Sequence, residues 1–258
     1  MTPPTLRPLS VGEILDVSFT LYRRHFGALA TVALVCTGLP LVLRLFLEAG
    51  GGLFQNPALG LVYTIVFVTL NLVATAATVF IVSESYLGRP IAAREALNRS
   101  APYLSRILVC TLLLALVVFV GFLLLVIPGI ILAVGLALAV PVVVLEPKTS
   151  ASAALSRSWE LTRGFRWRIF GLGITLLVIL YVPVIAITGL FAIAMPGAAA
   201  GHFGPAIAAT VIGLAVGGLV QMFIYPLLYC VLTVTYYDLR VRKEAFDLEV
   251  LAAGLSRA

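Results

Sequence analysis

Six long apolar stretches constrain the fold of this chain more than any other feature of its sequence. An α-helix rises 1.5 Å per residue, so about 20 apolar residues cross the roughly 30 Å hydrocarbon core of a bilayer. The stretches cover residues 26–47, 58–82, 107–127, 130–145, 169–193 and 206–236. They predict an all-α integral membrane protein with six transmembrane helices, forming a single polytopic membrane domain over residues 1–258.

The overall composition excludes the common soluble classes. Of the 258 residues, 62% are hydrophobic and 11% are charged, against about 45–50% and about 25% in a soluble domain. A soluble fold of this size has no interior large enough for such an excess of apolar side chains. We therefore expect neither a soluble enzyme nor a nucleic-acid partner, although the net charge is +6.

Prolines in the apolar stretches predict one turn and two kinks. Pro128 and Gly129 separate the third stretch from the short fourth one. Because proline ends a helix and glycine tolerates a turn, this pair favours a tight hairpin at the far membrane surface. A single kinked helix and a re-entrant pair are the alternatives. Pro183 and Pro226 fall inside predicted spans, where they predict kinks.

The basic residues indicate the orientation of the chain. In a six-span arrangement, 16 of the 17 Lys and Arg residues fall on one side of the membrane, and Arg44 falls on the other. Short loops rich in Lys and Arg stay in the cytoplasm, so both termini are predicted to be cytoplasmic. Arg outnumbers Lys by 15 to 2, a bias typical of GC-rich prokaryotic genomes. The predicted location is therefore the plasma (inner) membrane of a prokaryote, crossed several times.

A short motif recurs along the chain. Residues 95–100 read EALNRS, residues 153–158 read AALSRS, and a fainter third copy lies at residues 15–23. Each copy precedes two apolar stretches, so the pattern predicts three repeats of a short helix plus a transmembrane hairpin. The predicted repeat units and the cytoplasmic tail cover residues 10–87, 88–147, 148–245 and 238–258.

The short helices are predicted to be amphipathic. Residues 151–162 place apolar and small side chains at i, i+3, i+4 and i+7, with polar side chains opposite. A helix with Arg on one face and Trp or Phe on the other suits the cytoplasmic headgroup layer and anionic lipid. A bent extension of the following span is the alternative. The predicted contacts with lipid or with a partner are Arg23, Arg24, Arg99, Arg157, Trp159, Arg163 and Arg168.

Two acidic residues at the ends of spans are candidates for ion pairs. Glu146 and Asp238 lie at the predicted cytoplasmic ends of the fourth and sixth spans. Their expected partners are Arg163, Arg168 or Arg240, and a gate or ligand contact is the alternative.

A few polar and small residues lie within the predicted spans. Asn71 and Gln221, together with Thr37, fall near mid-membrane, where buried amides usually join helices by hydrogen bonds. Small residues at 133, 137 and 141 form a ridge that allows close helix approach, either within the chain or between copies. The sequence therefore leaves open whether the chain forms a homo-oligomer or binds another membrane protein.

Cofactor chemistry has little basis in the sequence. No spacing typical of a zinc, P-loop or dinucleotide site occurs. Cys36, Cys110 and Cys230 all fall within predicted spans and are expected to be small core residues rather than disulfide partners. We therefore expect no cofactor, no metal and no catalytic residue.

Several runs of sequence resemble a known bacterial family. They are LRPLSVGEILD at residues 6–16, ALSRSWELTRG at 154–164 and YYDLRVRKEAFDLE at 236–249. In these runs the chain resembles proteins grouped with the membrane domain of glycerophosphodiester phosphodiesterases, and the related YciC-type inner-membrane proteins. The resemblance implies a multi-span protein without an established activity of its own.

The phosphodiesterase activity of fused family members does not carry over. It belongs to a separate soluble barrel with metal-binding Glu and Asp and paired His residues, whereas this chain has only His25 and His202, on opposite predicted faces. The sequence therefore favours a noncatalytic membrane scaffold or accessory subunit that contacts anionic lipid or a membrane partner. The alternative is a transporter or channel for an apolar or lipidic substrate.

Overall fold

The computed structural model describes residues 7–49, 56–194 and 203–246, and all regular elements within these ranges are helical. Predictions that concern His202 or the tail beyond residue 246 lie outside the described residues. The helices in chain order are α1 (Val11–Arg24), α2 (Phe26–Ala33), η1 (Leu34–Gly38), α3 (Leu39–Ala49), α4 (Pro57–Tyr86), α5 (Ala93–Ser100), η3 (Ala101–Tyr103), α6 (Leu104–Leu124), α7 (Val126–Gly135), α8 (Ala139–Leu145), α9 (Ala151–Thr162), α10 (Arg166–Ala194) and α12 (Phe203–Glu244).

Six helical segments are long and apolar enough to cross a bilayer. They are Phe26–Leu47, Pro57–Tyr86, Ala93–Leu124, Val126–Leu145, Arg166–Ala186 and Ala215–Glu244. This confirms the prediction of an all-helical chain with six candidate spans. Many large apolar side chains on these segments remain exposed, such as Phe46 at 77% and Leu123 at 75%, which suits a lipid environment.

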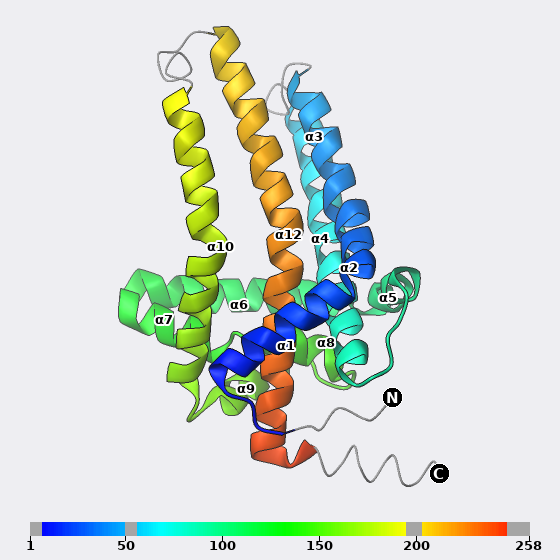
Figure 1. The fold of residues 1–258 in the computed structure, drawn as a ribbon, viewed down its shortest axis with the longest axis vertical. Coiled ribbons are helices and arrows are strands. Elements are labelled where there is room, and N and C mark those ends of the chain that lie inside the picture. The colour runs from blue at the N-terminus through cyan, green and yellow to red at the C-terminus, as the bar shows by residue number, and fades with distance from the viewer. Residues whose placement is uncertain (1–6, 50–55, 195–202, 247–258) are drawn as a thin grey trace.

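The molecule has a clear long axis. The first span (α2, η1 and α3), α4, α10 and α12 run along it, whereas α1, α8 and α9 gather at one end (Figure 1). α5 lies on the same half, as does the C-terminal end of α12. We call this end, made by α1, α5, α8, α9 and the last turns of α12, the polar end.

α6 and α7 form a hairpin that differs from the predicted one. The chain turns at Leu125, whose backbone is extended (φ −168°, ψ 157°), and Pro128 lies inside the first turn of α7. The turn is therefore three residues earlier than predicted, because the first turn of a helix accepts a proline without losing a hydrogen bond. A Cβ on Gly129 would lie 2.5 Å from the ring of Phe122, so glycine serves close helix contact here rather than the turn itself.

The α6–α7 hairpin also lies across the long axis instead of along it (Figure 1). This orientation resembles the alternative of a re-entrant helix pair more closely than it resembles two transmembrane helices parallel to α4, α10 and α12. Hydropathy does not distinguish the two arrangements, because an apolar helix pair has the same composition in either orientation.

Prolines in the other spans do not end their helices. Pro226 lies inside α12 and Pro183 lies inside α10. Two spans are irregular at other places. The candidate span Val126–Leu145 is interrupted between α7 and α8. In the first span, Leu34–Gly38 form a π-helical turn, and the Leu39 N–H donates to the Leu34 carbonyl five residues back. Pro40 follows directly, and the wider turn accommodates its missing N–H.

The three short helices bury equivalent residues. Ile14, Ala96 and Ala154 are each 0% exposed, and so are the serines four residues later, Ser18, Ser100 and Ser158. One face of each helix is thus packed: α5 lies against α4, α9 against α8 and α1 against α12. The amphipathic spacing therefore serves packing of each short helix against the end of a span. Of the three, α5 continues through η3 directly into α6.

Gly135, at the end of α7, provides a test of the packing between α7 and α9. A Cβ at this position would lie 2.4 Å from the ring of Trp159. We expect Gly135→Ala to lower the free energy of unfolding by about 1–3 kcal/mol through overpacking, measured as a lower Tm in detergent. Gly12→Ala in α1, where a Cβ meets nothing within 4 Å, is the control and should not lower Tm. An unchanged Tm for Gly135→Ala would contradict this contact.

Candidate functional site

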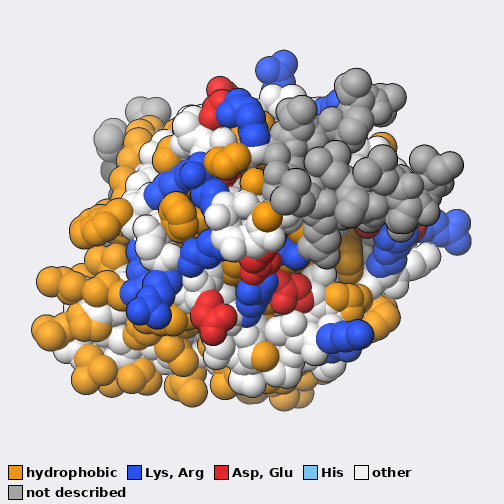
Figure 2. All heavy atoms as spheres, turned by 90° about the horizontal axis from the view of Figure 1, so that it is seen from below, with side chains coloured by type: hydrophobic (Ala, Val, Ile, Leu, Met, Phe, Trp, Pro, Cys, Tyr) orange, Lys and Arg blue, Asp and Glu red, His pale blue; other side chains and the backbone are white. Residues whose placement is uncertain are grey.

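The polar end gathers charged side chains of both signs. Viewed from below, this face shows acidic side chains surrounded by Lys and Arg, with apolar side chains toward the rim (Figure 2). Three separate networks of ion pairs and hydrogen bonds lie at the polar end, and each network joins a short-helix segment to the end of a span.

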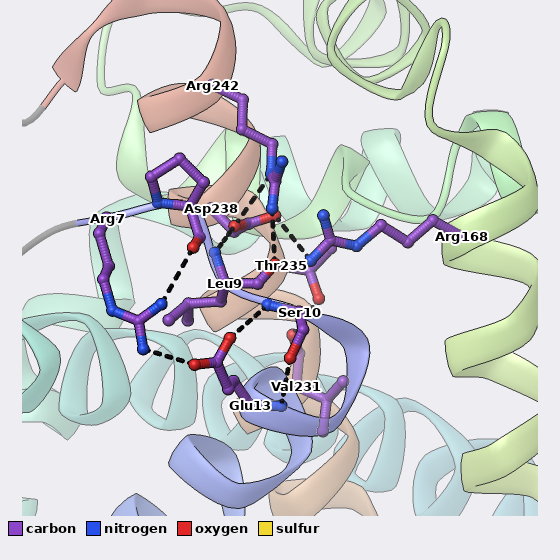
Figure 3. A network of polar contacts seen from close by, with 10 residues as sticks. Arg7, Leu9, Ser10, Glu13, Arg168, Val231, Thr235, Asp238 and Arg242 are labelled. Atoms are coloured by element: carbon purple, nitrogen blue, oxygen red, sulfur yellow. Dashed lines mark hydrogen bonds and ion pairs between the residues drawn. The ribbon is translucent and has the colours of Figure 1, made fainter.

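The first network is built around the buried carboxylate of Asp238 in α12 (Figure 3). Its side chain is 0% exposed. Oδ1 accepts the Leu9 N–H at 2.7 Å, and Arg242 Nε donates to both carboxylate oxygens, at 3.2 and 3.0 Å. Arg168 of α10 is paired with Oδ2 at 3.3 Å. The Leu9 carbonyl in turn accepts from Arg168 and, at 2.6 Å, from Arg242. One carboxylate and the backbone N–H and C=O of one residue, Leu9, thus join the start of α1, the start of α10 and the end of α12.

The start of α1 is fixed next to this network. Ser10 and Glu13 form a capping box, in which the Glu13 carboxylate accepts the Ser10 N–H at 2.7 Å and also pairs with Arg7. The hydrogen bonds from Arg7 and from Ser10 lower the pKa of Glu13 to about 2. The Glu13 carboxylate therefore stays ionised above about pH 2, and its contribution to stability is lost as pH falls from its ordinary pKa of 4.5 to about 2.

The second network joins α8, α9 and α12. Glu146 Oε1 accepts from the Tyr236 hydroxyl at 3.0 Å and from Arg157 Nε at 3.3 Å. Arg157 also pairs with Oε1 of Glu244. The second carboxylate oxygen of Glu244, Oε2, accepts a hydrogen bond from Arg240 Nε at 3.0 Å. Two carboxylates and two guanidinium groups therefore alternate across the three helices.

The third network joins α4 and α5. Glu84, near the end of α4, pairs with Arg89 at 3.3 Å and with Arg99 of α5 at 3.6 Å. Next to it, the hydroxyl groups of Ser83 and Tyr237 lie 2.6 Å apart and connect α4 to α12.

A common pattern relates the three networks. Each of α4, α8 and α12 carries an acid near or at its end, namely Glu84, Glu146 and Asp238. Each acid contacts the short-helix segment that packs there, through Arg99, Arg157 or the Leu9 N–H. Glu84 was not among the residues singled out from the sequence. The signal that could have identified it is the presence of an acidic residue near the end of the second, fourth and sixth spans.

The predicted contact residues fall into two groups. Arg99, Arg157 and Arg168 are engaged in the internal networks. Arg23, Arg24 and Arg163 are exposed, and none of them has an ion-pair partner among the described residues. Trp159 packs on Gly135 and carries the Arg166 guanidinium 3.7 Å above its ring.

The two predicted ion-pair acids have different outcomes. Asp238 lies beside Arg168, one of its three expected partners. Glu146 instead pairs with Arg157, eleven residues along the chain, which was not an expected partner. Because α9 folds back over the end of α8, Arg157 of α9 reaches Glu146.

The predicted intramembrane polar residues lie together. Thr37, Asn71 and Gln221 line one small cavity between the first span, α4 and α12, with a volume of about 20 Å³, enough for one water molecule. The Asn71 amide donates to the Phe67 carbonyl of its own helix at 2.9 Å. The contact that Asn71 makes is thus within α4, not the expected bond between helices.

The middle of this chain matches a known protein family. The model of the uncharacterised protein family UPF0259 matches residues 53–202, more than half of the sequence. The chain belongs to the UPF0259 family. A UPF0259 membrane protein of Pectobacterium carotovorum is 34% identical over 94 residues, which are 36% of this chain and 37% of that protein.

The chain thus aligns with little more than a third of the length of the curated relative that it matches. No solved structure matches it. The UPF0259 match identifies a bacterial membrane protein family, which agrees with the six candidate spans. It does not extend to the phosphodiesterase or YciC names, so that finer resemblance stays a prediction.

Asp238 provides a test of the first network. We expect Asp238→Leu to lower the free energy of unfolding by roughly 3–5 kcal/mol, because two guanidinium groups then lose their buried counter-charge. The measurement is thermal unfolding of the full chain in mild detergent. The matched control is Glu95→Gln, which removes an exposed i,i+4 pair with Arg99 and should cost only about 0.3–0.5 kcal/mol. Equal effects of the two changes would contradict the assignment.

Proposed function

We propose that this UPF0259 chain is a noncatalytic membrane protein whose polar end faces the cytoplasm and binds anionic lipid headgroups. The observation that carries the proposal is the division of the arginines at this end into an internally paired set and an exposed set. The exposed, unpaired arginines are available to a ligand without loss of any contact that holds the fold together.

The exposed set suits a membrane surface. Arg23 and Arg24 end α1 immediately before the first span, whose first residue, Phe26, is 42% exposed. Arg163 follows α9 and lies four residues before Trp167, which is 86% exposed. Basic side chains beside exposed aromatic ones are typical of the headgroup layer. Each contributes about 1 kcal/mol of attraction to an anionic surface.

The proposal includes three repeats with both termini in the cytoplasm. The equivalent buried positions in α1, α5 and α9 support it, and so do the acids near the ends of α4, α8 and α12 that contact them. In this arrangement the spans come in pairs, and each pair returns the chain to the side where a short helix begins.

A role as transporter or channel for a lipidic substrate is the second candidate. One observation favours it: an apolar groove between α7, α10 and α12 that opens at the surface of the molecule.

A scaffold that contacts a membrane-protein partner through the same exposed arginines would behave differently when those arginines are changed. The partner would no longer copurify with the chain, whereas the preference for anionic lipid would stay unchanged.

The exposed arginines can be tested by neutralisation. We expect the triple variant Arg23→Gln, Arg24→Gln, Arg163→Gln to lose most of its preference for phosphatidylglycerol over phosphatidylcholine, a fall of roughly tenfold or more at about 1 kcal/mol per residue. The measurement is the relative association of spin-labelled lipids with the reconstituted full chain.

Two controls separate charge from folding. The triple Lys variant keeps the charge and should keep the preference. Arg157→Gln removes a paired arginine and should lower Tm while leaving the lipid preference largely in place. An unchanged preference in the triple Gln variant would overturn the proposed function.

A further inference from the structure

We propose that the groove between α7, α10 and α12 is a binding site for one bilayer phospholipid, with an acyl chain in the groove and the phosphate at Arg166. This site involves none of the exposed arginines discussed above, so it stands or fails independently of the proposed function.

Two adjoining cavities form the groove. The cavity that reaches α12, which we call the inner one, has a volume of about 350 Å³. The cavity that reaches Arg166 and Trp167, which we call the outer one, has a volume of about 450 Å³. Both are lined by Ile130, Val134 and Phe170, so the two cavities adjoin each other beside the first turns of α10. Each lies within the range of roughly 300–1,000 Å³ typical of small-molecule sites.

The inner cavity can accept only hydrocarbon. Its lining consists of apolar side chains and Gly173, apart from Thr235. The Thr235 hydroxyl donates to the Val231 carbonyl within α12 at 2.7 Å, so it is already engaged. A polar ligand group placed here would lose its hydrogen bonds to water without replacement, whereas an acyl chain gains about 0.8 kcal/mol for each buried CH₂ group.

The outer cavity ends at a cation. Arg166 lines it together with Trp167, and the Arg166 guanidinium is held 3.7 Å above the ring of Trp159. Its Nε is buried without a hydrogen-bond partner, and no carboxylate lies within ion-pair distance among the described residues. A guanidinium whose Nε is buried without a partner, beside an apolar groove, is complementary to an anion, and its planar fork suits a phosphate.

The order of these features matches the shape of a membrane lipid. Arg166 begins α10, and this end of α10 lies near the polar end (Figure 1). The groove is lined by residues of α10 between Arg166 and Leu176, together with residues of α7 and α12. Phosphate and acyl chain would thus be separated as they are in one leaflet of a bilayer. Trp167, 86% exposed at the mouth, has the amphipathic ring that favours the headgroup level.

Two glycines of α10 allow a matched test. A Cβ on Gly173 meets nothing within 4 Å, and this residue lines the inner cavity. A Cβ on Gly171 also meets nothing within 4 Å, but Gly171 does not line the groove. Gly173→Leu therefore adds an apolar side chain to the lining of the groove, and Gly171→Leu makes the same chemical change outside it.

The experiment is native mass spectrometry of the full chain in mild detergent, titrated with phosphatidylglycerol. We expect one lipid to be retained by the native chain and by Gly171→Leu, and its apparent affinity to fall at least tenfold in Gly173→Leu and in Arg166→Gln. Glycerophosphoglycerol, which has the headgroup without acyl chains, should not compete. The Tm of each variant shows that it is folded.

Three results would overturn the site. The first is equal lipid retention by Gly173→Leu and the native chain. The second is an equal loss in the two glycine variants, which would show a general effect of changes in α10. The third is a dimer of the native chain that Gly173→Leu converts to a monomer, which would assign the groove to a second copy of the chain.

Discussion

The buried carboxylate of Asp238 holds together parts of the chain that are far apart in sequence. A carboxylate withdrawn from water costs several kcal/mol unless its oxygens are fully engaged. Here the Leu9 N–H, Arg168 and Arg242 provide the required donors. Because the same two arginines also bond the Leu9 carbonyl, the peptide before α1 cannot shift without exposing a charge. The position of α1, and through it the capping box at Ser10 and Glu13, depends on this interaction.

The same principle explains why part of the positive charge remains available. Six acidic residues of the described ranges are each paired with an arginine, namely Glu13, Glu84, Glu95, Glu146, Asp238 and Glu244. These pairs occupy Arg7, Arg89, Arg99, Arg157, Arg168, Arg240 and Arg242. Since the whole chain carries 17 basic residues against 11 acidic ones, a surplus of cations is left on the surface. An arginine inside a network stabilises the fold, whereas an exposed one such as Arg163 is free to meet a lipid.

The spans could be predicted from the sequence because crossing a bilayer is a local requirement on length and hydropathy. The identity of the ion pairs could not, since it depends on how the short helices fold back. Glu146 illustrates this difference: its partner Arg157 lies on the helix that packs over it. Similarly, Pro128 marked a break between two apolar segments, but the helix begins two residues before it. The crosswise position of α6 and α7 and the groove beside α10 are also properties of packing, which hydropathy does not record.

The proposed orientation places the polar end, with its exposed arginines, in the cytoplasm. Its most direct test is labelling of single-cysteine variants in intact cells with a membrane-impermeant maleimide, in a chain whose buried Cys36, Cys110 and Cys230 are replaced. A cysteine at Lys148, between α8 and α9 at the polar end, should be labelled only after lysis. A cysteine at Asn56, at the opposite end before α4, should be labelled in intact cells. The reverse pattern would contradict the account, because the exposed arginines would then lie on the other side of the membrane.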